Sequence, residues 1–426
     1  MAELRPFRPL RYDPVRVGEL AAVVAPPYDV ISPAARDALY ARSEFNVVRL
    51  ILNRAEDPYA DAAATLRRWR QDGILARDGQ AALGYHVERF ALPDGSTRQR
   101  EGLLGIVRLE AFDTGRIRPH ERTFASPKED RMRLLRACRT NLSPIFGLLA
   151  QPPSAIDPAR TAAAQRSPDV QVRDDTGVEH RLWLLTDKAV TGALSAALAD
   201  EPVIIADGHH RYETALAYAE QCRAAGAVDA DAPSNFVLMY LTSMRDPGLV
   251  VLPTHRVFAA GIDPAALLTQ VRQHFAVEAF PRTAVADFRA RLHAASGQEQ
   301  VGLVLSGRDD LFVVTLDNET LAQRYAAAIA PVVRRLDVTV LDTVILRGLL
   351  GIDCVAAGQD GRLFYTHADD EAISAVEKGA QAAFLMNAPR LDDVQAVCSA
   401  GETMPQKSTY FYPKLLTGLV FHPFDD

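Results

Sequence analysis

The chain has 426 residues, 48% of them hydrophobic, and its formal net charge is −7 at pH 7. This length is typical of two or three globular domains with buried cores. Acidic and basic residues are interspersed without a long basic run. The composition therefore argues against nucleic acid as a partner, and any anionic ligand must be held by a local pocket.

Two further features of the sequence concern its compartment. The four cysteines lie far apart, in a pattern that predicts neither a zinc knuckle nor a disulfide framework. The N-terminus lacks an apolar signal core, and no stretch approaches the roughly 18 apolar residues that a membrane span requires. We therefore expect a cytoplasmic protein with no membrane partner.

Residues 1–110 are predicted to form a mixed α+β region. The amphipathic pattern over residues 55–73 predicts a helix that ends at Gly73. Residues 84–110 then predict two strands joined at Asp94-Gly95, a dipeptide typical of tight hairpins.

Residues 111–260 are expected to form a core region, and residues 261–426 a C-terminal α/β region. IRPHERT (117–123) is predicted to lie on a loop between a strand and a helix. EPVIIAD (201–207) is predicted to be a short buried strand that leads into a helix ending at Gly226. Further on, helices and strands alternate, and about the last hundred residues are predicted to be mainly helical.

The segment ADGHHR places an acid, two histidines and an arginine at the predicted start of that helix. A strand that ends in Asp207-Gly208 and leads into a helix presents backbone N–H groups and a positive dipole end, an arrangement that binds phosphate. Arg211 offers a bidentate grip on phosphate oxygens, and His209 and His210 donate hydrogen bonds or move protons. Asp207 is a candidate ligand for Mg²⁺ or a partner that orients a histidine.

Simpler interpretations of this segment remain open. Asp207 is also a common helix-capping residue, and the histidines could be satisfied by neighbouring groups. A zinc site on His209 and His210 is disfavoured, because adjacent histidines lack the i, i+4 spacing of helical zinc ligands.

Three other segments carry candidate site residues. His120 and Glu121 stand side by side in IRPHERT, where the glutamate is either a general base or one half of a solvated ion pair. Arg256, at the end of LPTHR, is a second candidate phosphate contact or a strand-end residue that faces solvent. Lys407, in MPQKSTYFYPK, belongs either to a loop that closes over an anion or to a packed C-terminal strand.

Sequence motifs of several enzyme classes are absent. The chain has no Gly-x-Ser-x-Gly elbow, no Walker A motif and no GxGxxG before a helix. A serine hydrolase, a P-loop ATPase and a Rossmann dehydrogenase therefore have no specific support.

The order of the motifs is itself informative. PPYDVIS, IRPHERT, SPIF, ADGHHRYETAL, LPTHR and MPQKSTYFYPK resemble, in this order, a prokaryotic family of unknown function over nearly the full length. ADGHHR also resembles the phosphate-binding signature of the ParB/sulfiredoxin superfamily, which includes free serine kinases with an upstream His-Glu pair. This second resemblance covers about a third of the chain. It implies a mixed α/β fold with a ParB/sulfiredoxin-like core and elaborations at both ends.

The resemblance implies a phosphotransferase that uses ATP or ADP with Mg²⁺ and acts on a small hydroxylated metabolite, free serine first. A phosphohydrolase with the same phosphate site and a non-catalytic nucleotide-sensing regulator are the alternatives. The catalytic residues implied are Glu121 as the base, with His120, Asp207 and His209. The phosphate-binding residues expected are Gly208, His209, His210, Arg211, Arg256 and Lys407, with Asp207 as the metal ligand.

Overall fold

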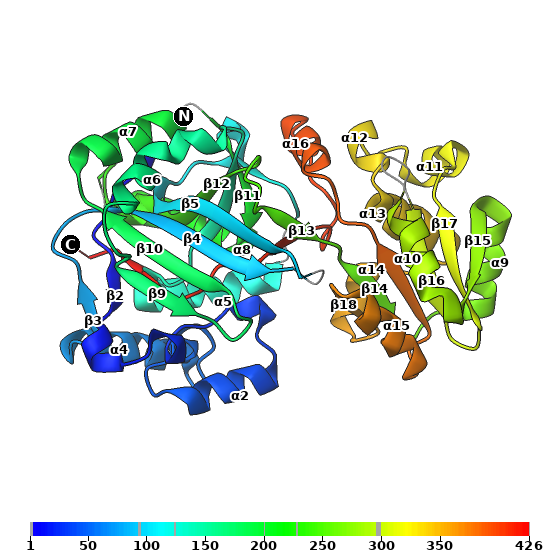
Figure 1. The fold of residues 1–426 in the computed structure, drawn as a ribbon, viewed down its shortest axis with the longest axis horizontal. Coiled ribbons are helices and arrows are strands. Elements are labelled where there is room, and N and C mark those ends of the chain that lie inside the picture. Colours follow the sequence, from blue (N-terminus) through cyan, green and yellow to red (C-terminus); the bar gives the residue numbers. More distant parts are fainter. Residues whose placement is uncertain are drawn as a thin grey trace. The chain divides into compact units, whose positions relative to one another are not determined.

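The structure, a computed structural model shown in Figure 1, describes residues 3–92, 95–122, 125–199, 201–226, 229–294 and 300–425. The chain divides into two compact units, each with its own sheet. Unit 1 comprises residues 1–119, 123–250 and 413–426, and unit 2 comprises residues 120–122 and 251–412.

Unit 1 is built on a mixed sheet that has nine strands among the described residues, in the order β6-β11-β8-β12-β5-β4-β10-β9, with β1 paired to β5. β11 runs parallel to β6 and β12 runs parallel to β8, whereas β4, β5 and β10 pair antiparallel. The strands are β1 (Leu4–Arg5), β4 (Leu83–Ala91), β5 (Thr97–Arg108), β6 (Ile117–Pro119), β8 (Ile145–Leu149), β9 (Val170–Arg173), β10 (Glu179–Leu185), β11 (Val203–Asp207) and β12 (Phe236–Ser243).

Two short strand pairs and the helices complete unit 1. β2 (Leu10–Tyr12) pairs with β3 (Leu75–Arg77), and β7 (Thr140–Asn141) pairs with β21 (His422–Pro423). In Figure 1, α6 and α7 lie together beside the sheet, and α5 and α8 pack against each other. The helices are α1 (Pro14–Val17), α2 (Pro33–Arg42), α3 (Val48–Ile51), α4 (Pro58–Gln71), α5 (Ala125–Cys138), α6 (Asp157–Ala163), α7 (Lys188–Leu198) and α8 (His209–Ala224).

Local sequence signals predict several of these elements correctly. α4 forms where the amphipathic pattern predicts a helix, because the Asp57 side chain accepts from two backbone N–H groups and Pro58 occupies the first turn. β4 and β5 form the predicted antiparallel hairpin. Asp94, half of its predicted turn, lies outside the described residues.

The two faces of the large sheet differ in polarity. On one face, apolar side chains of β4, β5, β10 and β12 pack against residues of α6, α7 and α8 in a single buried core. The opposite face of β4 and β5 carries His86, Glu88 and Arg100, all of them buried. Because strand residues two apart share a face, the alternation in β4 separates these polar groups from the core.

Unit 2 contains a six-stranded antiparallel sheet, counted over the described residues, in the order β15-β17-β16-β19-β14-β18. Its strands are β14 (His255–Phe258), β15 (Ala276–Pro281), β16 (Gln300–Leu305), β17 (Asp310–Thr315), β18 (Leu363–Thr366) and β19 (Ala382–Met386). Its helices are α9 (Pro264–His274), α10 (Val285–His293), α11 (Glu319–Ala326), α12 (Pro331–Arg334), α13 (Asp337–Thr339), α14 (Cys354–Gln359), α15 (Asp369–Glu377) and α16 (Leu391–Ser399), with a π-helical segment over Val340–Leu349.

The mixed α/β fold class is confirmed. Helices make up most of the regular structure in about the last hundred residues, as expected, but this region also contributes β18 and β19 to the second sheet. β19 is a five-residue apolar run that is buried throughout, and periodicity alone cannot distinguish such a run from a segment of buried helix. The ParB/sulfiredoxin-like core remains a prediction.

The two units also differ from the expected boundaries at residues 110 and 260. β5 lies before the first boundary and β12 lies after it, yet the two strands pair with each other. The final residues, 413–426, belong to unit 1, where Phe421 joins the core of α3 and α4. Among the described helices, none is both long and apolar enough to cross a membrane.

His422 makes the folding of unit 1 sensitive to acid. Burial lowers its pKa from about 6.5 to about 4, so the folded protein keeps this imidazole neutral while the unfolded chain protonates it. The stability that this group contributes is therefore complete above about pH 6.5 and is lost as the pH falls towards 4, by about 3 kcal/mol. Glutamine in His422→Gln cannot titrate. Between pH 7 and pH 4, the free energy of unfolding of this variant, measured with denaturant, should therefore fall by about 3 kcal/mol less than that of the wild type. Parallel losses in the two proteins would contradict this assignment.

Candidate functional site

The side chains of ADGHHR are organised around the carboxylate of Asp207, the last residue of β11. Arg211 Nη2 lies 2.6 Å from Asp207 Oδ2, and Lys414 Nζ lies 2.7 Å from Asp207 Oδ1. Burial alone would raise the pKa of Asp207, but Lys414 and Arg211 outweigh burial and hold the pKa well below its usual value. One strand, one helix and the C-terminal segment are thus joined by a single anion.

Gly208 explains how Arg211 reaches this position. It has a φ of +90°, a backbone conformation that residues other than glycine rarely adopt. A Cβ atom at Gly208 would lie 3.0 Å from the Arg211 guanidinium, so the arginine folds back over the glycine. The same guanidinium donates to the carbonyl oxygen of Pro144.

A cavity of about 60 Å³, lined by both apolar and polar side chains, lies beside Arg211, and this is enough volume for several water molecules. It contains two guanidinium groups and several hydroxyl and amide groups from segments far apart in the sequence. Its lining residues are Tyr28, Ile51, Arg131, Leu134, Leu135, Thr140, Asn141, Leu142, Ser143, Arg211, Thr214 and Val237. The Thr214 hydroxyl has no hydrogen-bond partner among the described residues, although the residue is only 4% exposed.

Two arginines line the cavity on the side formed by α5 and α8, Arg131 paired with Asp130 and Arg211 paired with Asp207. The Arg131 guanidinium lies 4.1 Å from the centre of the Tyr28 ring, in a cation–π contact. Burial raises the pKa of Tyr28, so its hydroxyl remains protonated at neutral pH and is available as a donor. Arg131, Arg211 and the positive end of the α8 dipole together suit an anionic ligand.

The two histidines of the motif occupy the first turn of α8. His209 is buried, with 9% exposure, and His210 is partly buried. Together with Asp207, Gly208 and Arg211, they lie in unit 1.

His120, Glu121 and Lys407 come together in unit 2. Glu121 Oε1 accepts from the backbone N–H groups of Ser408 and Thr409, both at 3.0 Å, and Glu121 Oε2 accepts from that of Lys407 at 3.2 Å. Successive backbone N–H groups that converge on one anion form a nest, and Lys407 reaches this geometry with a φ of +57°.

His120 supports the same carboxylate. Its Nε2 atom lies 2.7 Å from the Thr409 hydroxyl oxygen and 3.4 Å from Glu121 Oε1, and the residue is only 1% exposed. The Thr409 hydroxyl in turn donates to Glu121 Oε1. The predicted pairing of His120 with Glu121 therefore occurs within a hydrogen-bonded loop, and the Lys407 side chain is exposed.

Arg256 is the site prediction that fits this arrangement least well. It is 1% exposed, its guanidinium contacts both oxygens of Asp342, and it donates to the carbonyl oxygen of Thr254. A buried arginine with this many partners has a structural explanation, because its charge is already compensated. Its phosphate role stays a prediction that the geometry does not favour.

Magnesium at Asp207 is disfavoured for a related reason. Each oxygen of this carboxylate already accepts from a cationic side chain, and a third cation would have to displace one of them. The donor set in unit 1 therefore fits an anion better than Mg²⁺.

Sequence reasoning missed several residues of the cavity and one cluster elsewhere. Lys414 and Tyr28 stand in motifs noted from the sequence but were not selected, and Arg131 and Thr214 carry no local signal that distinguishes them from other helix residues. The buried group His86, Glu88 and His180 was also missed. The signal that could have revealed it is the presence of polar side chains inside buried strands: His86 and Glu88 stand two apart in β4, and His180 stands in β10.

Comparisons with known proteins identify a family but no activity. The profile of the family described as "Protein of unknown function (DUF1015)" matches residues 4–339. No curated protein matches the chain.

Solved structures similar to the chain are distant from it. A conserved hypothetical protein from Pyrococcus furiosus is 14% identical, over 74% of this chain and 92% of that one, with a TM-score of 0.34. Free serine kinase in complex with AMP is 12% identical over 75% and 91%, with a TM-score of 0.36. SbnI with a C-terminal truncation, from Staphylococcus aureus, is 12% identical over 76% and 90%, with a TM-score of 0.34. Similarity at this level says nothing about activity.

Asp207→Asn tests the central ion pairs. Because the folded-state pKa lies below the unfolded value of about 3.9, the carboxylate contributes its full stability above that pH, and the contribution is lost as the pH falls below it. We expect the variant to be less stable than the wild type by about 3 kcal/mol at pH 7, since two partly buried cations lose their counter-charge. The two proteins should approach each other in stability in urea titrations below pH 4.

A matched control is Glu129→Gln, which removes the exposed partner of Arg133 on α5. Exposed pairs of this kind contribute little, so this variant should unfold like the wild type. An equally small effect of Asp207→Asn would show that the ion pairs around Asp207 are not what stabilises this region.

Proposed function

The chain belongs to the DUF1015 family, whose function is unknown, and we propose that it is a nucleotide-dependent phosphotransferase acting on a small hydroxylated metabolite. Free serine is the first candidate, because the Asp-Gly-His-His-Arg segment and the upstream His-Glu pair resemble those of free serine kinases. One observation carries the proposal: distant segments of unit 1 bring two arginines and several hydroxyl groups together, among apolar side chains, around a cavity beside the first turns of α8.

In this proposal the cavity binds the nucleotide phosphates. Arg211 and Arg131 compensate the phosphate charge, and the Thr214 hydroxyl and the first turn of α8 donate hydrogen bonds. Asp207 keeps Arg211 and Lys414 in place by ion pairing. Positioning and charge neutralisation supply most of the acceleration in phosphoryl transfer, so a site of this kind suits the chemistry.

Glu121 is the proposed base, which would take the proton from the acceptor hydroxyl. His120 and Thr409 would orient its carboxylate. The three backbone N–H donors also favour a second candidate, a nucleotide-binding protein without catalysis, because a carboxylate that already accepts several hydrogen bonds is a weaker base.

Arg211→Ala should weaken nucleotide binding by about 1.5–3 kcal/mol if its guanidinium contacts phosphate. Arg211→Lys should restore only part of the affinity, because the planar fork of donors is lost. Isothermal titration with ATP and ADP measures both. The matched control is Arg133→Ala, which removes a 58% exposed arginine of α5 and should bind nucleotide like the wild type.

Thr214→Val separates ligand binding from folding. The hydroxyl is buried without a hydrogen-bond partner among the described residues, so an isosteric apolar side chain should leave stability unchanged or raise it. If the hydroxyl donates to bound phosphate, the same variant should nevertheless bind nucleotide more weakly. Unchanged affinity in both Thr214→Val and Arg211→Ala would rule out this cavity as the phosphate site.

Glu121→Gln tests the catalytic part of the proposal. We expect turnover to fall roughly 10²–10⁴-fold with nearly unchanged nucleotide affinity, since the base is lost and the phosphate site is not. Labelled ATP with free serine and other hydroxylated amino acids, followed by product analysis, measures transfer. Free phosphate released without any acceptor would instead indicate a phosphohydrolase.

Thr409→Val is the control for disruption of the loop. It removes the hydroxyl contacts to Glu121 and His120 but keeps the carboxylate and its backbone donors. This variant should retain far more turnover than Glu121→Gln. Nucleotide binding without detectable transfer to any acceptor in the wild type would favour the non-catalytic candidate.

A further inference from the structure

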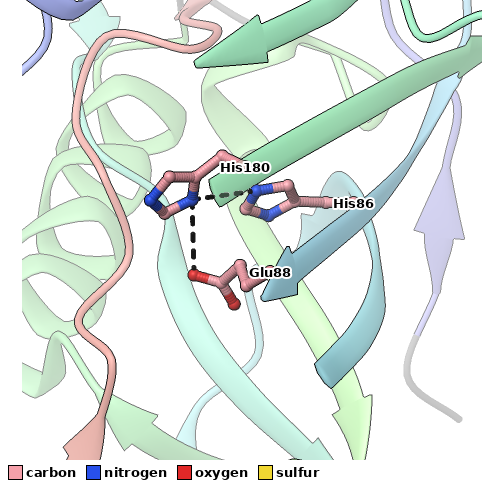
Figure 2. A group of neighbouring side chains, drawn as sticks. All are labelled: His86, Glu88 and His180. Carbon is pink, nitrogen blue, oxygen red and sulfur yellow. Dashed lines mark hydrogen bonds and ion pairs between the residues drawn. The ribbon is translucent and has the colours of Figure 1, made fainter. Parts of the chain in front are cut away.

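His86, Glu88 and His180 form a compact buried group on the polar face of the large sheet (Figure 2). His86 and Glu88 stand two residues apart on β4 and so share one face, and His180 of β10 is paired directly with Glu88. The three residues are 2%, 0% and 1% exposed, respectively. Their side chains point toward one another from two adjacent strands.

Hydrogen bonding explains only part of this arrangement, because the two imidazoles share a long hydrogen bond and Glu88 Oε1 takes no part in it. His180 Nδ1 lies 3.4 Å from His86 Nε2 and 3.6 Å from Glu88 Oε1, and the second distance is too long for a hydrogen bond. Glu88 Oε1 has no hydrogen-bond partner among the described residues, although it is fully buried. An unsatisfied buried carboxylate oxygen is costly unless something else occupies the space before it.

The same distances agree with those between ligands of a tetrahedral metal ion. An ion with bonds of about 2.05 Å to nitrogen and oxygen separates its donor atoms by about 3.3 Å. An octahedral ion with bonds of about 2.1 Å would bring adjacent donors to about 3.0 Å, which fits less well. We propose that His86, Glu88 and His180 bind a divalent transition-metal ion, with zinc as the best match and water as the fourth ligand.

The surroundings of the group support metal binding. His180 Nε2 lies 3.3 Å from Asp174 Oδ2, so the ring is oriented by a carboxylate on the side away from the group, as metal-ligating histidines usually are.

Arg100 determines which oxygen of Glu88 is available. Its guanidinium contacts Glu88 Oε2 at 2.6 Å and leaves Oε1 facing the histidines. The carboxylate would therefore bridge the arginine and the metal ion. Because the ligands are buried, the ion would be loaded during folding, independently of the proposed function.

Metal analysis of the refolded full-length protein tests the proposal. Wild type refolded with equimolar zinc and then dialysed should retain one zinc per chain, and His86→Gln and His180→Gln should retain almost none. His422→Gln, which alters another buried histidine of unit 1 outside the group, should retain one zinc. Wild type without zinc, or His180→Gln with a full equivalent, would overturn the proposal.

Two further measurements apply if the histidine variants do not fold. Asp174→Asn alters only the residue behind His180 and should weaken zinc affinity by about 10–100-fold in chelator competition while keeping one site. Cobalt-substituted wild type should show the intense visible absorption of a tetrahedral site. A weak octahedral spectrum, or an unchanged affinity in Asp174→Asn, would contradict the assigned ligands.

Discussion

Unit 1 depends on the neutralisation of one fully buried positive charge. Arg100 lies in β5 with no exposed surface, and Glu88 of the neighbouring strand β4 contacts its guanidinium directly. Removing either partner would leave an unpaired charge in the middle of the sheet, a strongly destabilising change. The guanidinium also makes a cation–π contact with the ring of Phe146, whose centre is 4.6 Å away, and donates a hydrogen bond to the carbonyl oxygen of Pro413 at 2.8 Å.

The contact with Pro413 links this charge to the candidate phosphate site. Lys414 follows Pro413 directly and pairs with Asp207, and Phe146 is the residue of β8 that faces Asp207 across the strand pair. The buried arginine therefore holds both the C-terminal segment and the strand on which the Asp207 group depends. A change at Arg100 would therefore disturb the segment that carries Lys414 and the strand that pairs with β11.

The two histidine-containing groups differ in what compensates their carboxylates. Asp207 is surrounded by two cationic side chains, which makes its neighbourhood suitable for an anion and unsuitable for a further cation. Glu88 has a single cationic partner and one oxygen facing two imidazoles. This difference in local charge explains why we assign phosphate to the start of α8 and a metal ion to the polar face of the sheet.

Elements with local causes could be predicted from the sequence, whereas the meeting of distant side chains depends on the complete fold. The amphipathic helix α4, the hairpin of β4 and β5, and the strand, glycine and helix around Gly208 follow from contacts within a few residues, so pattern reasoning found them. Lys414 joins Asp207 from 207 positions away, Arg131 of α5 lines the same cavity as Arg211, and His180 joins Glu88 across 92 positions of the numbering by strand pairing. No local propensity encodes such pairings, because strand order and the return of the C-terminal segment are set by burial of the whole core.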